Sequence, residues 1–191
     1  MAYVLRALIP VVWIAWLLYW ILAARATNET ERRENFRSRM THYAPLILGG
    51  VFLGVPNVLG PMMDGEFHAQ TLAWLWPTVG LIVVGLGFAT WARIWLGRNW
   101  SAEVTVKRDH ELIRSGPYAV VRHPIYTGLL LALVGTALSI SKWRALVGLV
   151  FISAALLRRV TIEERFMTVQ FGDAYRRYRA DVPALIPFLT P

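Results

Sequence analysis

The chain has 191 residues, the length of one domain, and 56% of them are hydrophobic while only 17% are charged. This composition, with nine Trp and a mean hydropathy of +0.45, excludes an ordinary soluble domain and indicates a polytopic membrane protein. The formal net charge of +8 does not indicate a partner such as nucleic acid, because the basic residues lie at the ends of apolar blocks and form no basic face. The absence of Cys excludes disulfides, thiolate metal sites and a Cys nucleophile.

The apolar segments predict an all-α integral membrane protein with about five transmembrane helices. In chain order, we expect these helices at residues 4–24, 43–59, 72–96, 124–140 and 145–159. The last two form a short helical hairpin at 124–159, with a tight turn at 141–144. Each is only about 15 to 17 residues long, so a tilted or partly sunken hairpin is expected. The fifth helix then continues as a polar, C-terminal cytoplasmic helix.

Small and charged residues around the first three helices carry further predictions. Residues 25–42 hold five Arg and three Glu without an apolar stripe, so they are expected to form a solvated loop or a short helix at the headgroups. Glycines in the second and third helices would allow neighbouring helices to approach closely. These are Gly49, Gly50, Gly54, Gly80, Gly85 and Gly87. Arg93, near the end of the third helix, is expected to extend towards the membrane interface.

The distribution of Lys and Arg predicts the orientation of the chain. With a cytoplasmic C-terminus, residues 25–42, 97–123 and 158–191 all face the cytoplasm and hold 16 of the 20 Lys and Arg. The N-terminus then lies outside, and the polar segments that carry the candidate site lie together on the cytoplasmic side.

The first candidate site lies in residues 110–128, HELIRSGPYAVVRHPIYTG, a polar stretch between two apolar blocks. Ser115-Gly116-Pro117-Tyr118 has turn chemistry, and Pro124 suits the first turn of the helix that follows. A helix start carries unpaired N–H groups and a partial positive charge. Beside Arg122 and His123, this favours an anionic ligand group such as a carboxylate. The alternative is a basic turn at the membrane surface.

The second candidate site lies in residues 156–179, which have helical spacing and many charges. Arg159 and Glu163 are four residues apart and therefore share a helix face near the bilayer boundary. They form either a simple surface salt bridge or a pair in which each side chain faces a different reactant. Tyr175 and Tyr178 could cover a ligand ring or anchor the helix at headgroup level, and the anchor is favoured slightly. The same choice applies to Trp95 and Trp100.

Taken whole, the pattern S-G-x-Y-x-x-x-R-H-P-x-Y-x-G in residues 115–128 resembles the signature of the isoprenylcysteine carboxyl methyltransferase (ICMT) family. Residues 163–188 resemble that family's C-terminal block, E-E-(six residues)-F-G-x-x-Y-x-x-Y-x-x-x-V-P-x-x-x-P-F. The resemblance covers about residues 96 to 188. It implies a membrane enzyme that uses S-adenosylmethionine (SAM) and releases S-adenosylhomocysteine, with residues 1–96 as an N-terminal membrane region and residues 97–191 as the SAM-binding methyltransferase region.

The same resemblance implies roles for individual residues. Arg159 would bind the acceptor carboxylate and Glu163 the cofactor, which makes these two the expected catalytic pair. The remaining cofactor-binding residues would be His110, Glu111, Leu112, Ile113, Tyr118, His123, Pro124, Ile125 and Tyr126. A polar residue about seven positions before His110 also contributes in relatives, and here this is Glu103 or Thr105. Glu164 would give solvation or support only.

The chemistry of the donor sets what such a site must do. A sulfonium methyl group is already activated, so its transfer mainly requires in-line placement and a desolvated acceptor, and no dedicated general base. The acceptor is expected to be hydrophobic or lipid-like, with an isoprenylcysteine carboxylate, an isoprenoid and a phospholipid amine all open. Two other functions are alternatives: an NADPH-dependent sterol-reductase-like enzyme, and a non-catalytic membrane scaffold or small transporter. The transporter is disfavoured because repeat halves and charges within the spans are not clearly visible.

Overall fold

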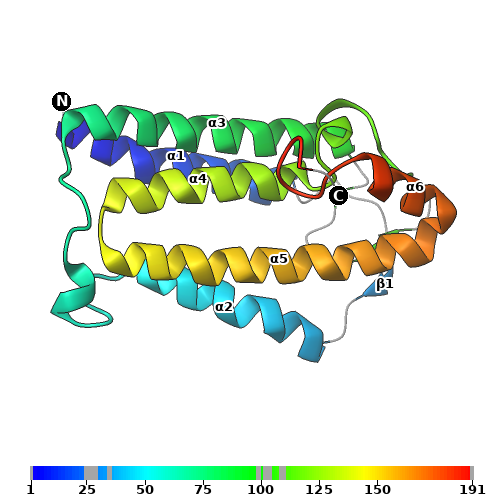
Figure 1. Ribbon diagram of the computed structural model, residues 1–191, viewed down its shortest axis with the longest axis horizontal. Helices are drawn as coiled ribbons and strands as arrows, with labels where there is room; N and C mark the ends of the chain where they lie inside the picture. Colours follow the sequence, from blue (N-terminus) through cyan, green and yellow to red (C-terminus); the bar gives the residue numbers. More distant parts are fainter. Residues whose placement is uncertain are drawn as a thin grey trace.

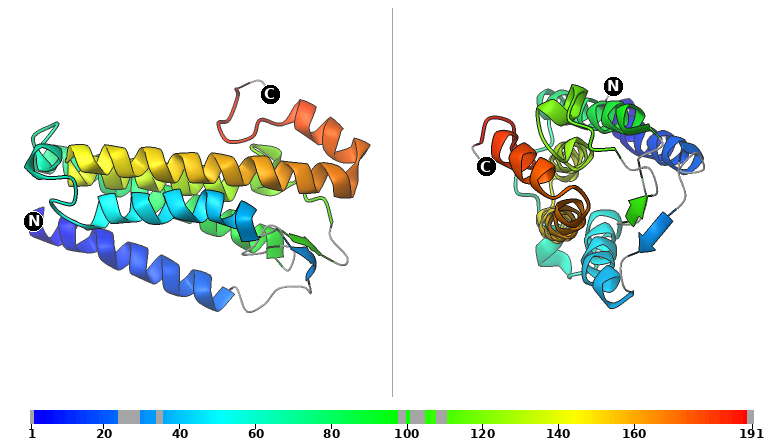
Figure 2. Two further views of the ribbon diagram at one scale, coloured as in Figure 1. Left: turned by 90° about the horizontal axis from the view of Figure 1, so that it is seen from below. Right: turned by 90° about the vertical axis from the view of Figure 1, so that its right-hand side faces the viewer.

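The computed structural model describes residues 2–23, 30–33, 36–97, 100, 105–107 and 111–189. Five long helices form an elongated bundle, seen from three directions in Figures 1 and 2. They are α1 (Ala2–Ala23), α2 (Phe36–Gly54), α3 (Leu72–Leu96), α4 (Pro124–Ile140) and α5 (Trp143–Phe171). The shorter elements are β1 (Thr30–Arg33), η1 (Pro61–Asp64), β2 (Thr105–Lys107), η3 (Gly116–Ala119) and α6 (Asp173–Asp181).

The predicted helices agree with these elements to different degrees. The bounds of α3 and α4 are those expected from the sequence. Helix α2 begins at Phe36, seven residues earlier than predicted, so the prediction that residues 25–42 form a loop or a short helix is wrong for their second half. The prediction of an all-α membrane bundle is confirmed, and beside the bundle β1 and β2 form a short two-stranded antiparallel sheet.

Glycine contacts join the helices in two pairs. A Cβ atom on Gly85 would lie 2.5 Å from the carbonyl oxygen of Gly128, so α3 and α4 meet backbone to backbone. Helices α2 and α5 meet in the same way, since a Cβ on Gly49 would lie 2.7 Å from the Gly148 carbonyl oxygen. The prediction of close packing is therefore confirmed for Gly49 and Gly85. It is wrong for Gly50, Gly54, Gly80 and Gly87, beside which nothing lies within 4 Å of such a Cβ in the described chain.

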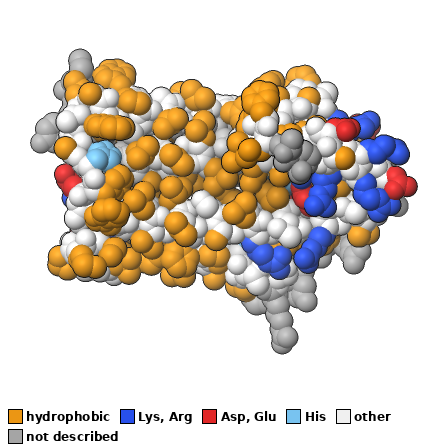
Figure 3. Space-filling view, viewed as in Figure 1, with side chains coloured by type: hydrophobic (Ala, Val, Ile, Leu, Met, Phe, Trp, Pro, Cys, Tyr) orange, Lys and Arg blue, Asp and Glu red, His pale blue; other side chains and the backbone are white. Residues whose placement is uncertain are grey.

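Membrane character follows from the length and the surface of the helices. Helices α3 and α5 are long and apolar enough to cross a membrane, and α4 and the apolar stretches Ala7–Ala23 and Met40–Gly54 are shorter. Large hydrophobic side chains are exposed along the bundle, while charged side chains gather near α6, as Figure 3 shows for one face. An apolar outer surface of this kind suits lipid rather than water as the surroundings. The protein is an integral membrane protein.

The polar end of the bundle is shaped by the way α5 ends. Helix α5 is 29 residues long, so it continues well beyond residue 159, where the hairpin was expected to end. It stops before Gly172, whose φ is +51°. A positive φ is accessible to glycine at little cost, and it turns the chain so that α6 folds back over α5. Residues 182–189, which we call the C-terminal strap, then run back along the long axis of the bundle (Figures 1 and 2).

Candidate functional site

Three segments that are distant in the sequence meet at the α6 end of the bundle (Figure 1): residues 111–123, the polar half of α5, and α6 with the C-terminal strap. Three hydrogen bonds hold the strap against the start of α4: Arg122 N to Pro183 O (2.9 Å), His123 N to Ala184 O (3.0 Å) and Thr127 Oγ1 to Leu185 O (2.7 Å). The two sequence blocks that were expected to build a site therefore lie side by side.

Glu163 is the centre of one cluster of side chains. The Tyr126 hydroxyl donates a short hydrogen bond to Oε1 of Glu163, and Nε of Arg159 donates to the same oxygen at 3.2 Å. On the other side, Nδ1 of His123 lies 3.6 Å from Oε2 of Glu163. The guanidinium of Arg159 also lies 6.0 Å from the centre of the Tyr126 ring. Four of the residues named from the sequence are thus brought into contact around one carboxylate, and Arg159 and Glu163 do form an ion pair.

Glu164 is the centre of a second cluster that touches the first. Arg122 donates to Oε1 of Glu164 from Nε (2.9 Å) and Nη2 (2.6 Å), and Arg179 of α6 lies 3.3 Å from Oε2. Arg122 Nη1 also donates to the carbonyl oxygens of Arg179 and Val182. Arg122 therefore ties α5, the end of α6 and the strap together, which gives Glu164 the supporting role expected for it.

His123 joins the two clusters. Its Nε2 lies 3.4 Å from Oε1 of Glu164, yet this buried atom forms no well-directed hydrogen bond within the described chain. Burial alone would lower the pKa of the imidazole, but the carboxylates of Glu163 and Glu164 outweigh it, so the pKa of His123 lies above its ordinary value of 6.5. The anionic groups at the start of α4 are thus the protein's own glutamates. The expectation of a ligand carboxylate at this helix start stays a prediction.

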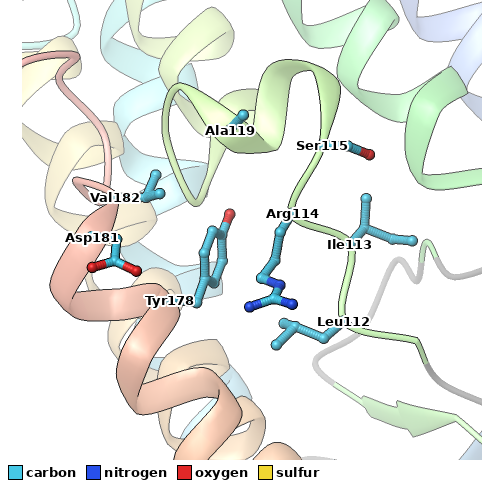
Figure 4. A pocket seen from close by; sticks show the side chains of 8 residues that line it. All are labelled: Leu112, Ile113, Arg114, Ser115, Ala119, Tyr178, Asp181 and Val182. Carbon is cyan, nitrogen blue, oxygen red and sulfur yellow. The ribbon is translucent and has the colours of Figure 1, made fainter.

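An open pocket of about 520 Å³ lies between residues 112–119 and α6. Its lining residues are Leu112, Ile113, Arg114, Ser115, Ala119, Tyr178, Asp181 and Val182. Figure 4 shows the Arg114 guanidinium between the side chains of Tyr178 and Leu112, while Asp181 enters from α6. The pocket offers apolar side chains and groups of both charge signs. Such a lining can contact both apolar and charged parts of a ligand.

Tyr118 lies against the pocket. Its carbonyl oxygen accepts a hydrogen bond from the Tyr178 hydroxyl at 2.6 Å, and Tyr178 lines the pocket. Burial raises the pKa of the Tyr118 phenol well above its ordinary range, and the negative charge of Glu163 raises it further. The pocket also borders the Glu164 cluster, because Val182 lines the pocket and its carbonyl oxygen accepts a hydrogen bond from Arg122.

Of the other residues expected to bind the cofactor, some line the pocket and others do not. Leu112 and Ile113 line the pocket, whereas Glu111 is exposed outside the lining. Pro124 is buried and Ile125 is half-buried in the first turn of α4, between the Glu163 cluster and the strap. His110 and Glu103 lie outside the described residues, and Thr105 belongs to β2.

Two charged residues of the pocket were not predicted from the sequence. Arg114 and Asp181 are 67 positions apart in the chain and meet only because α6 folds back. The signal that could have found them is the Phe171-Gly172-Asp173 sequence, because a glycine followed by Asp is typical of one helix ending and the next beginning. Without that break, a continuous α5 would carry Asp181 away from residues 112–115.

Several aromatic and basic residues differ from their predicted positions at the membrane interface. Tyr175 and Tyr178 are buried within the site end, so the favoured interpretation as headgroup anchors is wrong for both. Trp100 is buried under the guanidinium of Arg93, at 4.3 Å, whereas Trp95 is about half exposed and packs on Gly116. Arg93 itself is buried rather than extended. It donates to the carbonyl oxygens of Gly97 (2.9 Å) and Ala23 (2.6 Å), so it caps the ends of α3 and α1.

This fold and site define an integral membrane protein whose ligand site is built at one end of a helical bundle. The model of the isoprenylcysteine carboxyl methyltransferase (ICMT) family matches residues 78–169. Protein-S-isoprenylcysteine O-methyltransferase B of Arabidopsis thaliana is 30% identical over 153 residues, which cover 78% of this chain and 75% of that protein. The chain belongs to the ICMT family.

Two further similarities are more limited in extent. Protein-S-isoprenylcysteine O-methyltransferase of Schizosaccharomyces pombe is 33% identical over 117 residues, which cover 58% of this chain and 48% of that protein. The solved structure of the eukaryotic intramembrane Ras methyltransferase ICMT superposes with a TM-score of 0.53 at 21% identity, covering 79% of this chain and 51% of that one. The chain spans about half the length of both proteins, and the second similarity concerns the fold alone.

Proposed function

We propose that this protein is a SAM-dependent methyltransferase that acts on a hydrophobic, carboxylate-bearing acceptor at the membrane surface. The observation that carries the proposal is the meeting of the two sequence blocks at one end of the bundle, where Arg159 and Glu163 form an ion pair. An open pocket of mixed polarity borders the neighbouring Arg122–Glu164 cluster, because Val182 lines the pocket and accepts a hydrogen bond from Arg122. Family membership supports the same reaction class.

In this proposal the pocket residues hold the cofactor. Leu112 and Ile113 give an apolar wall for the nucleoside. Tyr118, His123, Pro124, Ile125 and Tyr126 close the inner side, and Glu163 supplies a carboxylate for the cationic part of SAM. When bound, SAM supplies an activated methyl group on a positively charged sulfur.

Arg159 is proposed to bind the acceptor. Its guanidinium is largely buried on α5, and a planar guanidinium matches a carboxylate through two parallel hydrogen bonds. An ionised carboxylate is already a nucleophile, so the chain needs no group that removes a proton from it. The protein contributes position, exclusion of water and charge balance: Arg159 faces the anion while Glu163 faces the cation.

The identity of the acceptor follows from the relatives only in outline. The names of the Arabidopsis and S. pombe proteins state that they methylate protein-S-isoprenylcysteine. We assign an isoprenylcysteine-like carboxylate to this chain on that basis and because Arg159 suits it. Incorporation of labelled methyl groups into prenylcysteine analogues, compared with extracted phospholipids and isoprenoids, tests the assignment. Transfer to an amine lipid alone would contradict the carboxylate acceptor.

Cofactor binding is tested separately from turnover. Calorimetry on detergent-purified protein should give binding of SAM and S-adenosylhomocysteine but not of NADPH, which the reductase-like alternative requires. Binding of NADPH in place of SAM would overturn the proposal. Absence of both would favour a non-catalytic membrane protein.

We also propose that the site faces the cytoplasm, with the N-terminus outside, because most Lys and Arg lie in the segments at that end. The chain has no native Cys, so Asp173→Cys at the site end and Lys142→Cys at the opposite end each introduce a unique thiol. A membrane-impermeant thiol reagent applied outside intact cells should label position 142 and spare position 173. The reverse pattern would contradict this orientation.

A further inference from the structure

The C-terminal strap leaves large apolar side chains without cover, although it is firmly attached. Phe188 is 97% exposed, Ile186 60% and Leu189 57%. The backbone turns here, with a Leu189 N–H bond to the Ile186 carbonyl and a φ of +65° at Phe188. A positive φ is unusual for an aromatic residue. Three exposed apolar side chains on a short, anchored turn indicate a surface that contacts something apolar.

The depth of the strap follows from the helices to which it is bonded. Helices α4 and α5 are joined by only two residues, so Ile140 and Trp143 lie at the same level, beside the exposed Lys142–Glu66 ion pair. With a rise of about 1.5 Å per residue, Thr127 lies roughly 20 Å and Glu163 roughly 30 Å from that level. The hydrocarbon core of a bilayer is about 30 Å thick. Thr127 is therefore inside its span and Glu163 at its edge.

The strap shares the level of Thr127, because Thr127 Oγ1 donates to the carbonyl oxygen of Leu185. Both ribbon views agree that the strap returns from α6 towards the middle of the bundle (Figures 1 and 2). Residues 186–189 thus lie at a depth where water is scarce, on the outside of the bundle.

The positive charge of α6, which lies further from the bilayer centre than the strap, also fits a phospholipid leaflet. Helix α6 carries Arg176, Arg177 and Arg179, and it begins after Phe171, roughly 42 Å from the Lys142 level by helical rise. An apolar turn below and arginines above match the two layers of a leaflet, acyl chains and phosphate headgroups. Charged side chains next to an apolar tip disfavour a second protein surface, which would have to bury them.

We propose that the C-terminal strap dips into the phospholipid leaflet, with Ile186, Phe188 and Leu189 among the acyl chains and the α6 arginines at the phosphates. The strap is also bonded to the backbone of Arg122 and His123. Lipid contact at Phe188 therefore holds the start of α4 in place. This proposal does not depend on methyl transfer.

The absence of native Cys allows the depth of a single position to be measured. Phe188→Cys, labelled with an environment-sensitive fluorophore, is reconstituted in vesicles of phosphatidylcholine and phosphatidylglycerol. Asp173→Cys, on the exposed first turn of α6, is the matched control. The label at 188 should be quenched by nitroxides on the acyl chains and shielded from aqueous iodide, by at least threefold relative to position 173. Position 173 should show the opposite order.

Each other outcome overturns the proposal. Equal iodide quenching at 188 and 173 would place the strap in water. Protection of position 188 from both quenchers would mean that protein covers it, such as a second copy of the chain. If Phe188→Cys does not fold, Leu189→Cys carries the same expectation, and a retained thermal midpoint is required of each labelled variant.

Discussion

The two ends of the bundle both enclose an arginine with a carboxylate and main-chain carbonyls, but among the described residues the site end also holds a buried histidine nitrogen without a hydrogen bond. At the end away from the site, Arg144 donates to Asp64 (2.8 Å) and to the carbonyl oxygens of Phe52 (2.6 Å) and Leu53 (2.8 Å). It fastens the η1 loop and caps α2. Its Nε and Nη1 donors are therefore bonded to groups inside the fold.

At the site end, two adjacent glutamates meet three arginines and a histidine, and an open pocket adjoins them. Nε2 of His123 is buried without a hydrogen bond in the described chain, and Glu163 is shared between donors from three residues. The difference indicates that the hydrogen bonds of Arg144 hold the fold together, whereas the clusters around Glu163 and Glu164 are arranged for a ligand. The following changes test that distinction, from the largest expected effect to the smallest.

Arg144→Ala should have the largest effect, and the effect should be on stability alone. Losing two hydrogen bonds from a charged group to carbonyls costs on the order of 3 kcal/mol. The thermal midpoint of the purified protein should fall by roughly 6 to 12 °C. SAM affinity, measured at a temperature where the variant is folded, should stay at the wild-type value. A selective loss of SAM binding would show that the two ends are coupled.

Glu163→Gln should weaken SAM binding with little loss of stability. The amide keeps the shape of the side chain but removes the charge that faces the cationic ligand, at a cost of about 1.5–3 kcal/mol, or roughly ten- to a hundred-fold in affinity. Calorimetry with SAM measures this. The neighbouring Glu164→Gln is the matched control, since Glu164 pairs with Arg122 and Arg179. It should lower the thermal midpoint more and SAM affinity less than Glu163→Gln does.

Arg159→Lys should separate acceptor binding from cofactor binding. Lysine keeps the charge but cannot make the planar, bidentate contact with a carboxylate, so turnover should fall about tenfold with SAM affinity unchanged. Arg158→Lys is the control, because adjacent residues point about 100° apart around a helix. Equal and small effects of both changes would return Arg159 to the role of a surface salt-bridge partner.

His123 makes stability depend on pH in a defined direction. Its pKa is raised in the folded protein by Glu163 and Glu164. The stabilisation is therefore fully present below the unfolded pKa of about 6.5 and is lost as the pH rises through the folded pKa. The loss amounts to about 1.4 kcal/mol for each unit of the shift. Thermal midpoints measured from pH 6 upwards should fall in the wild type. In His123→Gln this part of the slope should disappear, and an unchanged slope would exclude His123 as its source.

Lys142→Ala should have the smallest effect. Lys142 and Glu66 form a partly exposed ion pair next to Arg144, and such pairs contribute well under about 1 kcal/mol. The thermal midpoint should change by no more than a degree or two, which sets the scale for the Arg144→Ala result. A loss as large as that of Arg144→Ala would mean that the whole loop, rather than the buried guanidinium, gives the stability.

The sequence predicted best where local chemistry decides the structure. The bounds of α3 and α4 follow from apolar length and from Pro124, and the Arg159–Glu163 ion pair follows from helical spacing. The meeting of His123 and Tyr126 with Glu163 was implied only by the family resemblance. The start of α2 was missed because Arg37 and Arg39 interrupt its apolar pattern. The β1–β2 sheet was missed because Thr30–Arg33 show no alternation of apolar residues.

What the sequence did not predict depends on contacts between distant segments. Arg93, Arg122 and Arg144 are buried because each finds carbonyl oxygens contributed by another part of the chain. No local pattern marks those partners. Similarly, Arg114 and Asp181 become pocket residues only through the break at Gly172.

The glycine contact between α2 and α5 also has a consequence for the order of synthesis. Gly49 meets Gly148, which follows it by roughly 100 residues, while α3 and α4 are neighbours in the helix order. At about 5 to 20 residues per second, the ribosome delivers α5 roughly 5 to 20 seconds after α2. Throughout that interval the small-residue face of α2 lies in the bilayer without its partner, while α3 and α4 can already associate. Of the two helix pairs, the one that carries Arg159 and Glu163 is therefore completed last.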